Sequence, residues 1–261
     1  MVMSLSQYII NPMGKSNAVL NATAREAIRN SYKKKYDVTM LREHGNMQYT
    51  LYKDEKNNVF IAHFKVPSET IKRFYYDVVF EFSANADIEE AGTNLFKYNC
   101  RYFSNDPAFV YTYAHVFHIN DLMIEILRSK MSKKAIKKKP EEKNPTHNIG
   151  YVKSIYFAYL YMSARQLYDI NTFKAAAVVL SKRNLLANIE EADVKIQKRQ
   201  EAGKKLKAEL AKKKTKKETI ANSKPEIAKI NKTISGKVNG KMGNVNKVNK
   251  ITRKRSNFTK K

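Results

Sequence analysis

Several residue types that help to define the class of a protein are scarce in this sequence. Cys100 is the only cysteine, so no disulfide can form within the chain, and we expect a reducing or redox-indifferent setting rather than a secreted one. Only 8 of the 261 residues are glycine, and tryptophan is absent. No phosphate-binding glycine-lysine loop, paired-glycine fingerprint or nucleophile elbow is present. These absences predict a protein without phosphate-cradling catalysis.

Long hydrophobic runs are also missing. The longest apolar stretches, residues 120–127 and 155–162, fall far short of the roughly 20 residues that a membrane-spanning helix needs. Residues 1–14 lack the basic cluster followed by an apolar run that is typical of an export signal. We therefore expect no membrane partner and a protein that acts where it is made, in the cytoplasm, or inside a particle assembled there.

Aromatic and acidic residues become rare in the last quarter of the chain. All 16 tyrosines and 11 of the 12 phenylalanines precede residue 174, which leaves Phe258 as the only ring beyond it. Residues 195–261 carry 23 Lys and Arg against 4 Glu, a net charge of +19, whereas residues 1–194 carry 27 against 20, a net charge of +7. A segment of this composition cannot offset the entropy of ordering by itself. The chain thus reads as a folded module joined to a polycation.

The predicted fold class is α+β. We expect a compact domain over residues 1–190, in which an antiparallel β-meander sheet packs with helices. Residues 191–261 are expected to form a long basic helical extension and a low-complexity tail, because the composition from Thr219 onward is mainly Lys, Asn, Ile, Val, Ser, Thr and Gly.

Strands are expected where Val, Ile, Tyr, Phe and Thr are enriched between turn residues. These segments are residues 36–43, 47–53, 59–66, 73–83, 95–104 and 108–118. In residues 74–82, apolar side chains alternate with a mixed set, which predicts a sheet covered on one side only. Rings also alternate in residues 108–118 and favour a strand there, although an earlier start of the next helix stays open.

Helices are expected where apolar residues recur every three or four positions or where caps stand at the boundary. These segments are residues 16–35, 121–131, 151–168 and a long or kinked helix over 172–217. Residues 132–148 form a basic connector with Lys133, Lys134 and residues 137–139. We interpret this connector as a solvated loop, with contact to a phosphate backbone as the alternative.

No residue cluster in the sequence indicates catalysis or a cofactor. His115, His118 and Asp121 are spaced by three and could face one metal ion on a continuous helix. The strand pattern would instead place the two histidines on opposite faces, so no metal is expected. His63 and His147 have no obvious catalytic companions, and Cys100 lies far from both. We predict a non-enzymatic protein without a cofactor or a small-molecule substrate.

The basic segment is the strongest candidate binding site. Polycations bind nucleic acid by releasing its condensed counterions, and lysines favour contact with the backbone over reading of bases. Aromatic residues that could stack on bases are absent here. A solubilising tail without a dedicated partner is the alternative. The candidate binding residues for nucleic acid or an acidic partner are Lys204, Lys205, Lys207, Lys212, Lys213, Lys214, Lys216, Lys217, Arg253, Lys254, Arg255, Lys260 and Lys261.

Two segments resemble virion structural proteins of tailed bacteriophages with AT-rich genomes. They are residues 95–113 (LFKYNCRYFSNDPAFVYTY) and 144–158 (NPTHNIGYVKSIYFA), and the Lys, Asn, Ile and Tyr bias of the chain adds to the likeness. The resemblance implies a non-catalytic component of the capsid or head-to-tail region, located in the virion. Its extension would contact other structural subunits of the assembly or the packaged DNA.

Two other classes of protein fit parts of the pattern. A ribosomal or other nucleic-acid architectural protein would also join a compact α+β body to a basic extension. A DNA-processing enzyme would need carboxylates clustered around a metal ion near the basic surface, and the sequence shows no such cluster.

Overall fold

The computed structural model describes residues 3–10, 30, 46–68, 70–83, 92–138, 144, 147 and 149–238, with side chains as far as residue 215. The chain forms two compact units, Met1–Lys205 and Leu206–Lys261. The helix expected over residues 16–35, apart from Asn30, and the strand expected over 36–43 lie outside the described residues.

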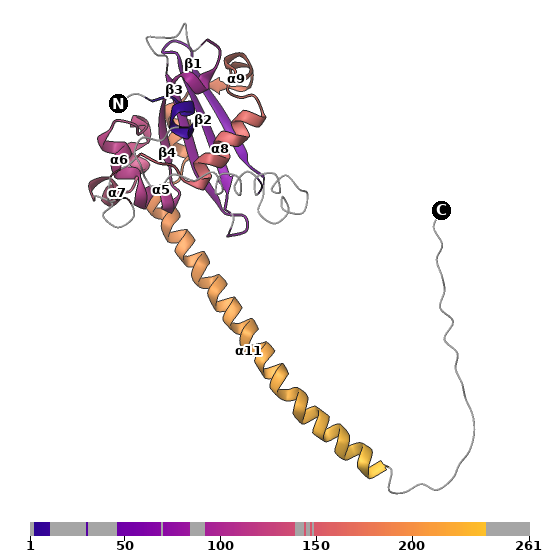
Figure 1. Ribbon diagram of the computed structural model, residues 1–261. Helices are drawn as coiled ribbons and strands as arrows, with labels where there is room; N and C mark the ends of the chain where they lie inside the picture. Colours follow the sequence, from indigo (N-terminus) through magenta and orange to yellow (C-terminus); the bar gives the residue numbers. More distant parts are fainter. Residues whose placement is uncertain are drawn as a thin grey trace, which may run out of the picture. The chain divides into compact units, whose positions relative to one another are not determined.

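A mixed five-stranded sheet with the order β4-β3-β2-β1-β5 organises the first unit (Figure 1). Four strands form the expected antiparallel meander: β1 (Gln48–Asp54), β2 (Val59–Pro67), β3 (Tyr75–Ser83) and β4 (Asn99–Ser104). The fifth, β5 (Val178–Val179), runs parallel to β1, so the all-antiparallel prediction holds for four strands only. It forms because the chain crosses from helix α9 (Ile170–Ala176) back to the β1 edge, where Leu180 N donates to Lys53 O at 2.8 Å.

Aromatic side chains fill one face of the sheet. Phe64 and Phe80 from neighbouring strands lie with ring centroids 6.0 Å apart, and Tyr161 of α8 (Lys153–Ala164) lies 6.1 Å from Phe64. On the β4 side, Tyr8 of α1 (Leu5–Ile10) lies 4.4 Å from Tyr102. Helices α1 and α8 therefore cover this face (Figure 1).

The opposite face is buried too, so the prediction of a sheet covered on one side is wrong. Ile61, Val79 and Phe103 point to this second face and are fully buried. The segment after β5 covers them, comprising α10 (Lys182–Asn188) and the first turns of α11 (Ala192–Val238). The Asn188 side chain donates to the Tyr52 hydroxyl on this face at 3.0 Å.

The strand predicted over residues 108–118 is also wrong, because this segment forms α5 (Pro107–Thr112) and α6 (Ala114–Ile119). Asp106 accepts a hydrogen bond from Ala108 N at 2.9 Å and caps α5. Pro107 occupies the first helical position, where its missing N–H costs nothing. These helix-start signals outweigh the alternation of rings that suggested a strand.

Other boundaries differ from the prediction in detail. A 3-10 turn, η1 (Leu95–Lys97), precedes β4, and a 3-10 helix, η2 (Glu125–Lys130), replaces the helix expected over residues 121–131. The connector expected as a loop contains the short helix α7 (Lys133–Lys137), whereas α8 confirms the helix expected over 151–168.

The long helix predicted over residues 172–217 is divided into α9, β5, α10 and α11. Asp169 and Ser181 cap the two new helix starts, at α9 and α10. Helix α11 continues to Val238, past the predicted end at Lys217.

Within the described ranges, none of the helices combines the length and apolar character needed to cross a lipid bilayer.

Candidate functional site

Helix α11 carries most of the charge that the sequence assigns to the extension. Its 47 residues contain 15 Lys and Arg and 5 Asp and Glu, a net charge of +10. Successive helical residues turn by about 100°, so Lys204, Lys205, Lys207 and Lys213 lie on different sides of the helix. Leu206 and Leu210, one turn apart on the same helix, are 46% and 57% exposed, so the apolar positions between these lysines are not packed in a core.

The structure places the predicted site residues in three groups. Lys204, Lys205, Lys207, Lys212, Lys213 and Lys214 are exposed on α11. Lys216 and Lys217 belong to the same helix, beyond the described side chains. Arg253, Lys254, Arg255, Lys260 and Lys261 lie outside the described residues.

Three cations at the start of α11 have a different role, which the composition alone did not reveal. Lys195 and Lys198 both pair with the Glu190 carboxylate just before the helix, at 2.6 Å for Lys195. Lys195 also lies over the Phe74 ring, 4.9 Å from its centroid. Both side chains are thus paired within the first unit, although Lys198 is 58% exposed, whereas Lys204 and Lys205 form no ion pair in the described part of the chain.

Arg199 makes the third contact of this anchor. Its guanidinium lies 5.4 Å from the centroid of the Tyr76 ring and 3.8 Å from the Asp106 carboxylate. The other Asp106 oxygen accepts from the Ser154 hydroxyl of α8 at 2.7 Å. One carboxylate thus joins α5, α8 and α11, and Ile196, only 7% exposed, adds apolar packing.

A buried polar network under the anchor is centred on Asp77 of β3, which is 3% exposed. One oxygen of Asp77 lies 2.9 Å from His63 Nε2 of β2. The other oxygen accepts from Asn105 Nδ2 at 2.6 Å and from Glu190 N at 3.3 Å. Asn105 Oδ1 in turn accepts from Asp77 N at 2.8 Å. The network therefore links the sheet to the segment between α10 and α11.

The electrostatics show that both acids of this region are held in their charged form. Burial raises the pKa of Asp77, but the hydrogen bond and charge of His63, with Lys195 and Asn105, outweigh burial and leave the pKa below its ordinary value. Desolvation likewise opposes ionisation of Glu190, and its contacts with Lys195 and Lys198 lower the pKa overall. Because Asp77 is ionised, His63 Nε2 is the donor in their hydrogen bond.

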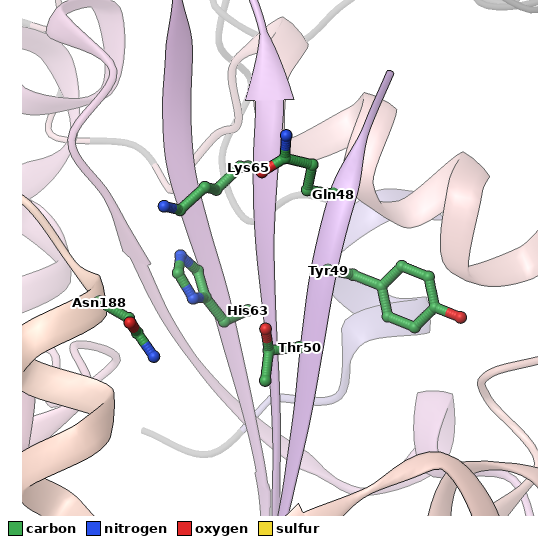
Figure 2. Close-up of a pocket in the computed structure, with 6 residues that line it drawn as sticks. All are labelled: Gln48, Tyr49, Thr50, His63, Lys65 and Asn188. Carbon is green, nitrogen blue, oxygen red and sulfur yellow. The ribbon is translucent and has the colours of Figure 1, made fainter. Parts of the chain in front are cut away.

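A small pocket of about 130 Å³ opens beside this network on the second face of the sheet. Its polar lining comes from Gln48 and Thr50 of β1, His63 and Lys65 of β2, and Asn188 of α10. In Figure 2, His63 and Lys65 point to the side of the sheet where Asn188 lies, whereas Tyr49 points to the other side. His63 is 2% exposed, so it forms the floor, while Gln48, Thr50 and Asn188 are exposed at the mouth.

Two of the three residues considered for metal binding contact other groups. His115 Nδ1 lies 2.5 Å from Ile136 O, and Asp121 pairs with Arg101 at 2.8 Å. No group of three His, Cys, Asp or Glu in the described part of the chain could hold a metal ion. Cys100 is buried, and this burial raises the pKa of its thiol well above the ordinary value, which disfavours the thiolate.

Comparisons of this chain with protein-family models, curated proteins and solved structures give no match.

Proposed function

We propose that this chain is a non-enzymatic assembly protein that binds nucleic acid through the phosphate backbone with the lysines of α11. The exposure of these lysines around the helix, from Lys204 to Lys214, is the observation that carries the proposal. Lysine ammonium groups act as point charges toward phosphates, and release of condensed counterions supplies the free energy of binding.

The anchor explains how such a helix is built into a folded protein. A helix with lysines on all sides gains little from apolar packing, and neighbouring like charges destabilise it. The contacts of Lys195, Ile196 and Arg199 fix its first turns to the first unit. A bound polyanion would neutralise the remaining lysines and stabilise the rest of the helix.

The proposed assembly is the virion of a tailed bacteriophage, in its capsid or head-to-tail region. The resemblance of residues 95–113 and 144–158 supports this assignment, and other structural subunits would then be partners of the protein. A ribosomal or other nucleic-acid architectural protein is the second candidate. The exposed lysines of α11 favour it equally, because RNA presents the same phosphate charges.

Replacement of three exposed lysines, Lys207→Gln, Lys212→Gln and Lys213→Gln together, tests the binding role of α11. Binding to duplex DNA and RNA is measured by fluorescence anisotropy over a salt range of about 50 to 200 mM. The wild-type affinity should fall linearly on a log–log plot against salt. The slope of the variant should be shallower by about 0.9 for each lost contact with a DNA phosphate.

The matched control removes the same charge from α7, by Lys133→Gln, Lys134→Gln and Lys137→Gln. These three side chains are exposed in the connector that offers the alternative phosphate contact. The control should keep the wild-type slope. A wild-type slope in the α11 variant, with a loss in the α7 variant, would move the binding surface to the connector and contradict the proposal.

A further inference from the structure

The pocket beside His63 contains a cation that is not used in the fold. Lys65 is half-buried and forms no ion pair within the described part of the chain, in contrast to Lys195 and Lys198 of the anchor. Lys65 pairs across the β2–β3 ladder with Asp77. The two carboxylate oxygens of Asp77 already accept hydrogen bonds from His63, Asn105 and Glu190 N. The ammonium of Lys65 is therefore available to a ligand in the pocket.

The other polar groups of the pocket can all donate hydrogen bonds. Thr50 pairs directly with His63 across the β1–β2 ladder and offers its hydroxyl from the same face. Gln48 pairs with Lys65 in the same way and offers a side-chain amide. Asn188 uses one N–H toward Tyr52 and retains the second. One ammonium and three neutral donors form a suitable environment for an oxyanion.

The pocket has room for a small anion. Its volume of about 130 Å³ accommodates a phosphate or sulfate ion.

The charge of the pocket depends on His63. The charged groups that face or adjoin its ring are Asp77 of β3 and Lys65 of β2, with Lys195 and Glu190 paired next to Asp77. Thr50 of β1 and Asn188 of α10 are neutral. When His63 is neutral, the charges of Lys65 and Asp77 cancel, whereas a protonated His63 leaves a net positive charge. An anion in the pocket therefore favours the protonated ring.

We propose that this pocket is a binding site for a small tetrahedral oxyanion, in which Lys65 supplies the charge, Thr50, Gln48 and Asn188 donate hydrogen bonds, and His63 takes up a proton on binding. The site lies in the first unit and does not depend on the lysines of α11.

Sulfate is the probe for the first test, because its charge does not change between pH 6 and pH 8. Sulfate is titrated into the full chain, and the ring resonances of His63 are followed by NMR. Saturable shifts are expected, and Lys65→Met should weaken binding about tenfold or more, because a charge-assisted hydrogen bond is lost. Lys56→Met is the control, since Lys56 is exposed in the β1–β2 turn and its loss removes the same charge outside the pocket. Equal binding by the Lys65→Met variant and the control would overturn the proposal.

Proton uptake is tested by repeating the wild-type titration at pH 6 and pH 8. Tighter binding at pH 6 than at pH 8 is expected, because protonation of His63 adds a positive charge beside the anion. Equal affinity for sulfate at the two pH values would contradict the role of this ring.

The source of the oxyanion is distinguished by competition. Three competitors of sulfate are compared at the His63 resonances. They are inorganic phosphate, a dinucleotide with a 5′-phosphate, and the same dinucleotide without this phosphate. Stronger competition by the phosphorylated form assigns the pocket to nucleic-acid ends, whereas competition by inorganic phosphate alone assigns it to the free ion. Failure of all three to displace sulfate would overturn the proposal without affecting the role of α11.

Discussion

Asp77 accepts hydrogen bonds from the sheet, from Asn105 and from the backbone that leads into α11. A buried carboxylate in such a network contributes strongly because its removal leaves several donors unpaired. Asp77→Asn should lower the free energy of unfolding by about 3 kcal/mol at neutral pH. Urea unfolding measures this loss. Asp54→Asn, at the last residue of β1, is the control and should have a much smaller effect.

The same variant tests the pKa of Asp77. The pKa of Asp77 is lower in the folded protein than its ordinary value. Its carboxylate therefore stabilises the fold at pH values above the pKa of an unfolded Asp, about 3.9. This stabilisation is lost as the pH falls through the pKa of the folded protein. The wild-type protein should therefore lose stability steeply below about pH 4. The Asn variant should lose less free energy of unfolding over this pH range. The loss that remains is due in part to Glu190, whose pKa is also lowered. Parallel pH profiles for the two proteins would refute this assignment.

Two glycines give opposite predictions for the same substitution. A Cβ at Gly150 would lie 2.8 Å from the Tyr113 hydroxyl oxygen and 2.9 Å from two atoms of the same ring. Gly150→Ala should therefore destabilise the protein by about 1–3 kcal/mol through overpacking. At Gly203 in α11, a Cβ would meet nothing within 4 Å. Gly203→Ala should instead stabilise the helix by about 0.5–1 kcal/mol. Thermal unfolding of both variants checks the signs, and a stabilising Gly150→Ala would disprove the close contact.

At the scale of elements, α11 contains a proline in its interior. A proline in a helix interior removes one hydrogen bond to the residue four positions earlier and crowds that carbonyl, which costs about 3 kcal/mol. Pro225 occupies an interior position of α11. Pro225→Ala should increase the helical signal in far-UV circular dichroism. The control is Pro107→Ala at the first turn of α5. A backbone N–H at this position would have no helical partner, so no gain in helical signal is expected. An unchanged signal for Pro225→Ala would mean that the helix does not continue through this position in solution.

Some elements were predictable from local signals and others were not. The alternation in β1 to β3 and the turns at Asp54 and Pro67 identified three strands. The pair Asp106–Pro107 carried a helix-start signal that should have outweighed the alternation after it. By contrast, β5 contains two residues, and its pairing with β1 depends on long-range packing. Nothing local to residues 178–179 specifies that partner.

The candidate site shows the same division. The basic composition of the extension predicts the lysines between Lys204 and Lys217 as binding residues, and this stays a prediction. Composition could not distinguish these lysines from Lys195 and Lys198, because the difference lies in contacts with the Glu190 carboxylate and the Phe74 ring. The pairing of His63 with Asp77 depends on the register of β2 with β3 and was not apparent without it.

At the scale of the whole molecule, the division at Lys205 separates two properties of the chain. Residues of the anchor, including buried Ile196, belong to the first unit, whereas Lys207, Lys212 and Lys213 belong to the second. A chain that ends at residue 194 would lose part of the anchor, while one that ends at Lys205 keeps it. The second truncation therefore separates folding from binding.

The most direct measurement compares the full chain with a chain ending at Lys205 in one experiment. Thermal unfolding and salt-dependent binding to duplex DNA are recorded for both proteins. We predict that the truncated chain keeps the unfolding midpoint of the first unit and loses most of the salt-sensitive affinity. A truncated chain that binds DNA as tightly as the full chain, with the same salt slope, would contradict the assignment of nucleic-acid binding to α11.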